Sequence, residues 1–204
     1  MGPAKTALVM MILANSLASE SWCSPRRTAP ENAGTQTLDL YLVDTPFQFA
    51  ATGKGIATRI FKDIGITLRW HAGRRPEGAG LWAIEVRADS APANVTGGAM
   101  AAASLPSGVI TIYLDRIRQT RDLGVNLALF GHVLAHEIGH VLQGEPRHSP
   151  EGILKRTWAP EDYSDMVAGR LTFTAEDVRL FRLSPLLKTT VLSAGFQPGN
   201  KMLP

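Results

Sequence analysis

Residues 132–148 read HVLAHEIGHVLQGEPRH, and this stretch decides how the fold of the whole chain is interpreted. Apolar side chains recur at helical spacing through residues 125–143, and the next residue is Gly144, a residue type that commonly ends helices. His136 and His140 are four positions apart, so a helix places both imidazoles on one face, one turn apart along the axis. We therefore expect both to reach a single metal ion.

Glu137 lies beside the two histidines on the same expected helix. Histidine nitrogens are common zinc ligands, and a catalytic zinc keeps one position open for water. A carboxylate beside the ligands can contact that water without binding the metal, which suits it to the role of general base. The apolar residues occupy the face opposite the histidines, which predicts a helix that lies between a core and a cleft.

A third ligand must come from outside this helix. His132 is on the same face, but it lies eight residues before His140, or about 12 Å along a helix, too far for both to bind one zinc. We assign His132 to the surroundings of the metal or to the cleft wall. Two candidates follow the helix: His148, and Glu161 in the sequence Glu-Asp-Tyr-Ser-Asp. His71, beside a predicted strand end, is expected to be a surface residue.

The segment 136–140, followed by a glycine turn and His148, resembles the metzincin clan of zinc peptidases. The third ligand of that clan is a histidine just after the active-site helix, so the resemblance implies zinc bound by His136, His140 and His148. It covers about residues 37–183, with only about twenty residues around the motif being specific.

Two features depart from the clan pattern. Its spacing would place a glycine at position 143 and the third histidine at position 146, where this chain has Gln143 and Pro146. Two extra residues therefore lengthen the turn. In the clan a tight turn with a methionine lies beneath the metal, and the matching stretch, residues 148–154, has Leu154 in that place. Leucine is a near-isosteric apolar replacement, and neither departure removes a ligand.

Glu161 supports a different reading. Glu161, Ser164 and Asp165 have the spacing of thermolysin-like peptidases, in which a glutamate ligand is followed by Ser-Asp. The same residues can equally form an acidic first helical turn. The strand-rich N-terminal half and the compact turn at residues 148–154 favour the metzincins, so His148 is the preferred third ligand and Glu161 the alternative.

The rest of the chain divides into a sheet-forming half and a mainly helical half. Period-two alternation and turn residues predict strands, and helical periodicity, Gly65, Pro160 and Thr174 mark helix ends. The predicted strands are residues 38–43, 67–70, 81–87, 99–104 and 109–114, and the predicted helices are residues 56–64, 125–143, 160–168 and one that begins at Thr174. The resemblance implies an α+β fold: a twisted, mostly parallel sheet with an antiparallel edge strand, the active-site helix, and a mainly helical C-terminal subdomain.

The N-terminus has the order of a secretory signal. Lys5 precedes an apolar run at residues 6–14, and small residues follow, with cleavage expected after Ala18. The run is too short to span a bilayer, so we expect no membrane anchor and a secreted protein, extracellular or periplasmic. The expected organisation is a signal peptide at residues 1–18, a flexible tail or short pro-segment at 19–36, and a catalytic domain at 37–204.

The composition limits the classes of partner and metal site that can be expected. The 204 residues carry a formal charge of +3, and Lys and Arg are spread along the chain, so we expect no nucleic-acid binding. Cys23 is the single cysteine, which excludes an internal disulfide and a cysteine-rich zinc site. We expect a monomer that acts on peptides or proteins.

The residues together predict a secreted zinc endopeptidase with one catalytic ion. Zinc lowers the pKa of a bound water, and Glu137 would take the proton and deliver it to the leaving amine. Residues 98–104 would pair with the substrate backbone, and Tyr163 is a weak candidate for stabilising the oxyanion. The alternatives are a thermolysin-like peptidase that uses Glu161 and a non-catalytic secreted zinc-binding protein, although a structural site has no need of a base at Glu137.

Overall fold

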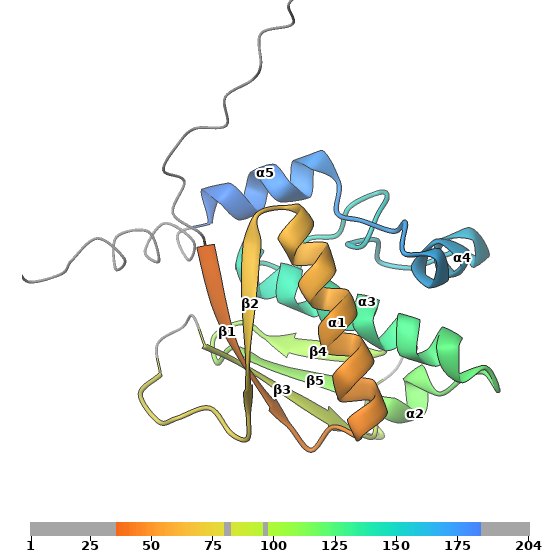
Figure 1. Cartoon of the computed structure of the whole chain (residues 1–204), viewed down its shortest axis with the longest axis horizontal. Helices are drawn as coiled ribbons and strands as arrows, with labels where there is room; N and C mark the ends of the chain where they lie inside the picture. The colour runs from red at the N-terminus through yellow and green to blue at the C-terminus, as the bar shows by residue number, and fades with distance from the viewer. Residues whose placement is uncertain (1–35, 80–82, 96–97, 185–204) are drawn as a thin grey trace, which may run out of the picture. The chain divides into compact units, whose positions relative to one another are not determined.

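The computed structural model describes residues 36–184, apart from residues 80–82 and 96–97 (Figure 1). Within these residues, five strands form one sheet in the order β2-β1-β3-β5-β4, parallel except for β4, which pairs antiparallel with β5 at the edge. The expected mixed fold, with its mostly parallel sheet and antiparallel edge strand, is confirmed. The elements are β1 Gln36–Val43, α1 Phe47–Asp63, β2 Ile66–Ala72, β3 Ala83–Asp89, β4 Ala101–Ser104, β5 Val109–Tyr113, α2 Leu114–Ile117, α3 Leu123–Gln143, α4 Pro160–Ala168 and α5 Ala175–Leu183.

The alternation in β1 separates the two faces of the sheet. Leu38 and Leu40 are buried in the core. On the other face, Asp39 accepts a hydrogen bond from Arg69 Nη2 at 2.8 Å and lies 2.7 Å from His71 Nε2, both on β2. His71 is therefore an exposed surface residue, as predicted. Such exposed pairs contribute little to stability, so the apolar face holds the sheet in place.

Helices α1 and α3 pack against each other and against the same face of the sheet, with α1 on β2 and α3 on β4 and β5 (Figure 1). Two glycines permit this close approach. A Cβ atom at Gly53 would lie 2.5 Å from the Phe130 ring, and one at Gly131 would lie 2.7 Å from Ile56. Both positions lie in the interface between α1 and α3, so the absence of a side chain there sets the distance between the two helices.

The ends of α3 are set by its own sequence. The Asp122 side chain accepts a hydrogen bond from the Val125 N–H at 3.2 Å, and Gly144 ends the helix with a φ of 70°. The predicted helix is confirmed, with an earlier start at Leu123. As predicted, it lies between the core and a cleft, and His136, Glu137 and His140 line that cleft. Residues 128–142 are all buried, because α4 and α5 also pack against this helix.

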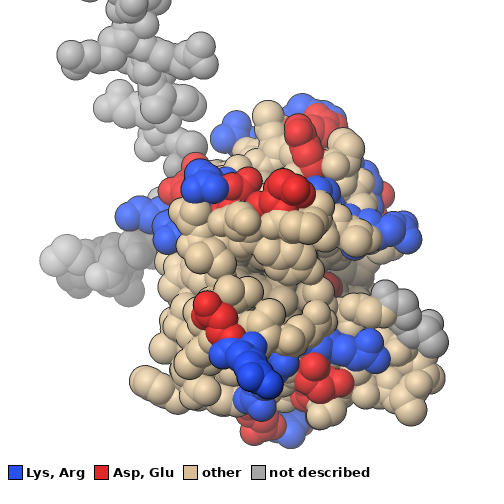
Figure 2. All heavy atoms as spheres, turned by 90° about the vertical axis from the view of Figure 1, so that its right-hand side faces the viewer, with Lys and Arg blue, Asp and Glu red and all other residues tan. Residues whose placement is uncertain are grey.

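The two C-terminal helices begin where the sequence predicts. α4 starts at Pro160, and Thr174 caps α5 through a reciprocal pair of hydrogen bonds with Asp177, each 3.1 Å long. The short helix α2 was not predicted. Figure 2 shows basic and acidic side chains interspersed on one face of the molecule.

Several predictions fall outside the described residues: the signal peptide, Cys23, the tail up to residue 35, and residues 185–204. None of the helices described is both long and apolar enough to cross a membrane.

Candidate metal centre

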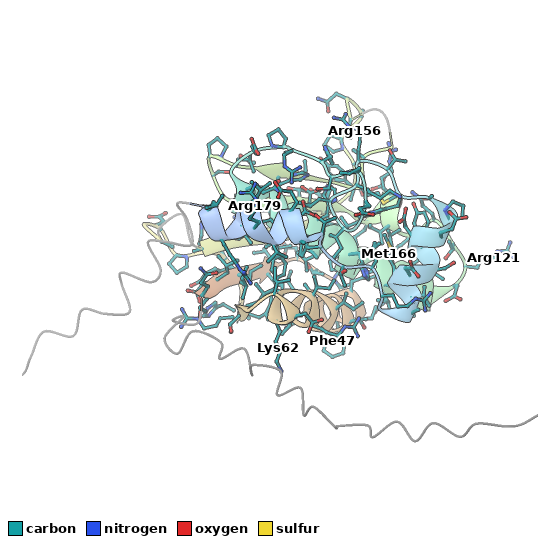
Figure 3. All side chains as sticks on the ribbon, turned by 90° about the horizontal axis from the view of Figure 1, so that it is seen from above. Phe47, Lys62, Arg121, Arg156, Met166 and Arg179 are labelled. Carbon is teal, nitrogen blue, oxygen red and sulfur yellow. The ribbon has the colours of Figure 1, made fainter. Side chains whose placement is uncertain are left out.

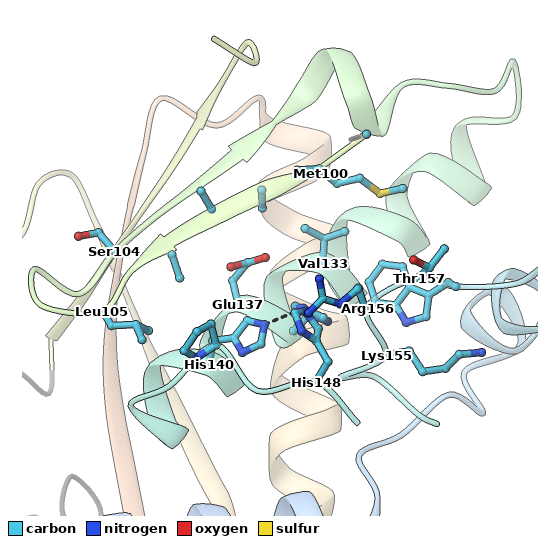
Figure 4. Close-up of a pocket in the computed structure, with 18 of the residues that line it drawn as sticks. Met100, Ser104, Leu105, Val133, Glu137, His140, His148, Lys155, Arg156 and Thr157 are labelled. Atoms are coloured by element: carbon cyan, nitrogen blue, oxygen red, sulfur yellow. Dashed lines mark hydrogen bonds between the residues drawn. The ribbon is translucent and has the colours of Figure 1, made fainter. Parts of the chain in front are cut away.

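Three histidines meet at the C-terminal half of α3. His136 and His140 lie on successive turns of the helix, and their Nε2 atoms are 2.9 Å apart. His148 comes from the loop after the helix, and one nitrogen from each of the three rings lies within 4.8 Å of the others (Figure 4). The structure thus brings together the three residues that the resemblance implied.

The backbone fixes which nitrogen of His136 faces the other rings. His136 Nδ1 lies 2.8 Å from the carbonyl oxygen of Ile153. A carbonyl can only accept, so Nδ1 donates, and Nε2 of the neutral ring carries a lone pair directed at the cluster. A hydrogen bond of this kind is the usual way in which a protein orients a histidine that binds metal.

Burial keeps the cluster in its metal-binding form. Burial first, and then repulsion from a charged His148, lowers the pKa of His136 to about 4 and that of His140 to about 4. The pKa of His148 is lowered by burial and by the positive charge of Arg156. Neutral imidazole is the form that binds metal, so the donors are ready at neutral pH.

The donor set fits zinc. Three neutral imidazole nitrogens converge, and three protein ligands are the usual number at a catalytic zinc. Nδ1 of His148 is buried without a hydrogen-bond partner among the described residues. An unsatisfied buried nitrogen is costly, and a cation or ordered water at the cluster is the kind of partner that would relieve it.

The loop that carries His148 is tied down on both sides. The Ser149 N–H donates to the Leu154 carbonyl at 2.8 Å, and the Ile153 N–H donates to the Thr172 carbonyl at 3.0 Å. Leu154 is fully buried beneath α3, where a Cβ atom at Gly139 would lie 3.0 Å from its Cδ2. Leu154 thus supports the histidine helix from the turn that the resemblance matched to the methionine turn.

Glu137 lies in a cleft beside the cluster. The cleft has a volume of about 810 Å³ and runs between α3, the loop after it and the edge strand β4. In Figure 4 the Glu137 carboxylate lies between β4 and the rings of His140 and His148. Burial raises the pKa of Glu137 to about 7. The carboxylate makes no ion pair or hydrogen bond with another described residue, so its burial is not explained by a structural partner.

The other candidates lie elsewhere. His132 is fully buried, its Nδ1 lies 2.8 Å from the Ala128 carbonyl, and it is not among the described residues that line the cleft. Of the two places expected for it, the surroundings of the metal and the cleft wall, the second is therefore wrong, because neighbouring elements cover that part of α3. Glu161 is exposed in the first turn of α4, outside the histidine group. Tyr163 does line the cleft.

Sequence reasoning missed two residues at the site. The Trp158 ring packs edge-on against His136, with the ring centres 5.5 Å apart. Asp177 binds both neighbours of His148, accepting hydrogen bonds from Arg147 Nη2 at 2.9 Å and from the Ser149 hydroxyl. The sequence places Asp177 in a capping box, but that pattern does not predict its contacts with Arg147 and Ser149, about thirty residues away.

No protein-family model matches this sequence, and no curated protein matches it. Among solved structures, the fold is similar to that of archaemetzincin from Methanopyrus kandleri, with a TM-score of 0.53 and 12% sequence identity. The similarity covers 76% of this chain and 98% of the archaemetzincin chain. At this identity the likeness concerns the fold alone.

Proposed function

We propose that this protein is a zinc-dependent endopeptidase. The observation that carries the proposal is the convergence of three imidazole nitrogens beside a buried carboxylate, Glu137, in a cleft that opens along a sheet edge. A purely structural zinc site needs the converging histidine nitrogens, but it needs neither the buried carboxylate nor the open cleft. The metzincin-like fold supports the same conclusion.

His136, His140 and His148 would hold one zinc ion. When bound, zinc polarises a carbonyl and acidifies a bound water. Glu137 would accept a proton from the attacking water and deliver it to the leaving amine.

Strand β4 would hold the substrate in an extended form. Among the residues that the structure describes, it pairs with β5 alone, and it forms the edge of the sheet beside the cleft. A free strand edge can add an extended peptide through backbone hydrogen bonds. The side chains of Ala101, Ala102 and Ala103 are small, so a peptide backbone can approach closely, and an open edge accepts the middle of a chain. This is the basis for proposing an endopeptidase.

We also propose that the protein is exported through residues 1–18. N-terminal sequencing of protein recovered outside expressing bacteria tests this, and a mature chain that begins at Ser19 is the expected result. Recovery only inside the cells with Met1 intact would contradict it.

Metal analysis and a broad peptide library test the function. The wild type should bind one zinc per chain and cleave peptides, whereas Glu137→Gln should keep zinc and lose at least roughly 100-fold in kcat/KM. Zinc in both proteins without cleavage by either would leave a non-catalytic zinc-binding protein. His148→Ala should lose zinc and Glu161→Ala should retain it, and the opposite pattern would make Glu161 the third ligand.

A further inference from the structure

Few charged residues line the cleft, and they differ in whether another residue of the protein balances their charge. Besides Glu137, the described residues that line it include two cations, Lys155 and Arg156, on the segment between the histidine loop and α4. Lys155 Nζ forms an ion pair with Asp162 Oδ2. The same Asp162 oxygen accepts a hydrogen bond from the Ala159 N–H at 2.6 Å, which fixes it in place. The charge of Lys155 is therefore balanced within the protein.

The charge of Arg156 is not balanced. Its side chain is exposed, and it forms no ion pair or hydrogen bond with another described residue. Figure 4 shows it beside His148.

The backbone that carries Arg156 is held close to the metal centre. Two residues earlier, Leu154 is fully buried under α3, and two residues later the Trp158 ring packs against His136. The side chain therefore starts from a fixed point at the rim of the cleft. The opposite wall, β4, offers only alanine and serine side chains, so no group there can neutralise the guanidinium.

We propose that Arg156 determines specificity by binding a carboxylate of the substrate, so that the enzyme prefers peptides with an acidic group close to the cleaved bond. This inference rests on the proposed peptidase function. A guanidinium binds carboxylates through two parallel hydrogen bonds, and the partly enclosed cleft strengthens that interaction. The carboxylate can belong to an Asp or Glu side chain or to the C-terminus of the peptide.

Matched peptides separate these sources. Each peptide is made with Glu or with Gln at the positions that flank the cleaved bond, and each with a free or an amidated C-terminus. The zinc-loaded wild type should cleave the acidic member of a pair roughly 10- to 100-fold faster in kcat/KM, the range of a charged hydrogen bond. A preference that survives amidation identifies a side-chain carboxylate, and one that disappears identifies the C-terminus.

Arg156→Gln should remove the preference, measured as the ratio of kcat/KM within each peptide pair on protein of verified zinc content. Arg121→Gln is the matched control, since Arg121 is exposed and projects from a different part of the molecule (Figure 3). It should keep the wild-type preference. Equal rates for both members of every pair in the wild type, or an unchanged preference in Arg156→Gln, would overturn the proposal.

A binding measurement separates this inference from the peptidase function. Calorimetry on the metal-free protein should show tighter binding of the acidic peptides to the wild type than to Arg156→Gln. If no peptide is cleaved but this difference is found, the peptidase function fails and the role of Arg156 stands. If peptides are cleaved without any dependence on Arg156, the role of Arg156 fails and the peptidase function stands.

Discussion

The hydroxyl of Ser149 donates a hydrogen bond to the carboxylate of Asp177, which joins α5 to the loop that carries His148. Arg147 donates to the same oxygen from the other side of the histidine. The second oxygen of Asp177 accepts from the Thr174 N–H, and the whole side chain is inaccessible to solvent. One carboxylate therefore fixes the backbone on both sides of the proposed third ligand.

Replacing Asp177 should weaken metal binding although it is not a ligand. Asp177→Asn keeps the shape but loses the charge that holds Arg147, and we expect the zinc dissociation constant to rise roughly 10- to 100-fold, as for other residues that orient ligands. Competition with a coloured chelator measures this. The control is Asp165→Asn on α4, which breaks an exposed ion pair with Arg170. Unchanged zinc affinity in a folded Asp177→Asn protein would contradict the role.

The size of residue 154 should matter more than its chemical type. Leu154→Met conserves volume, and we expect a loss of less than about 1.5 kcal/mol of unfolding free energy with zinc binding retained. Leu154→Ala leaves a cavity beneath Gly139 and should cost about 2–5 kcal/mol. Urea denaturation of the three proteins tests this, and equal midpoints for the two variants would show that Leu154 does not support the helix.

Because α1 packs closely on α3, replacing two different glycines of α1 by alanine should change the stability in opposite directions. Gly53→Ala places a methyl group against Phe130 and should destabilise the protein by about 1–3 kcal/mol. Gly55→Ala, on the exposed side of the same helix, meets no atom within 4 Å and should stabilise it by up to about 1 kcal/mol. Thermal unfolding of both variants gives the sign, and a loss of stability in both would refute the packing argument.

Glu85 should make the stability depend on pH in acid. Burial alone raises the pKa of Glu85, but hydrogen bonds from the Arg75 N–H and the Arg87 side chain outweigh it and hold the pKa below its usual value. The carboxylate therefore stabilises the fold above its unfolded pKa of about 4.3 and loses this effect as the pH falls through the lower folded value. Urea unfolding between about pH 5 and pH 2 should show a flatter decline for Glu85→Gln than for wild type.

Exposed Glu77 supplies the comparison for that measurement. Glu77→Gln should follow the wild-type decline in acid. If Glu85→Gln does so as well, the hydrogen bonds of Glu85 do not stabilise its charged form.

Local chemistry explains why much of the fold could be predicted. Caps such as Gly144 and Thr174 act within one helical turn, so their effect is visible in a few letters of sequence. The depth at which α3 is buried could not be predicted, because burial depends on which elements pack around a helix, and the sequence of α3 does not contain that information. The same holds for the segment between His148 and α4. Its path through space determines that Trp158 contacts His136 and that Arg156 has no partner among the described residues.

The proposed ligands all lie between residues 136 and 148, so a bound ion would close only short loops of chain. Closing a short loop removes little entropy from the unfolded state, and the helix, the capped turn and the Asp177 contacts already hold the histidines together without the ion. The empty protein should therefore stay folded and take up its metal as the last step of maturation. A chain of this kind can fold before it meets zinc and bind the ion wherever it is supplied.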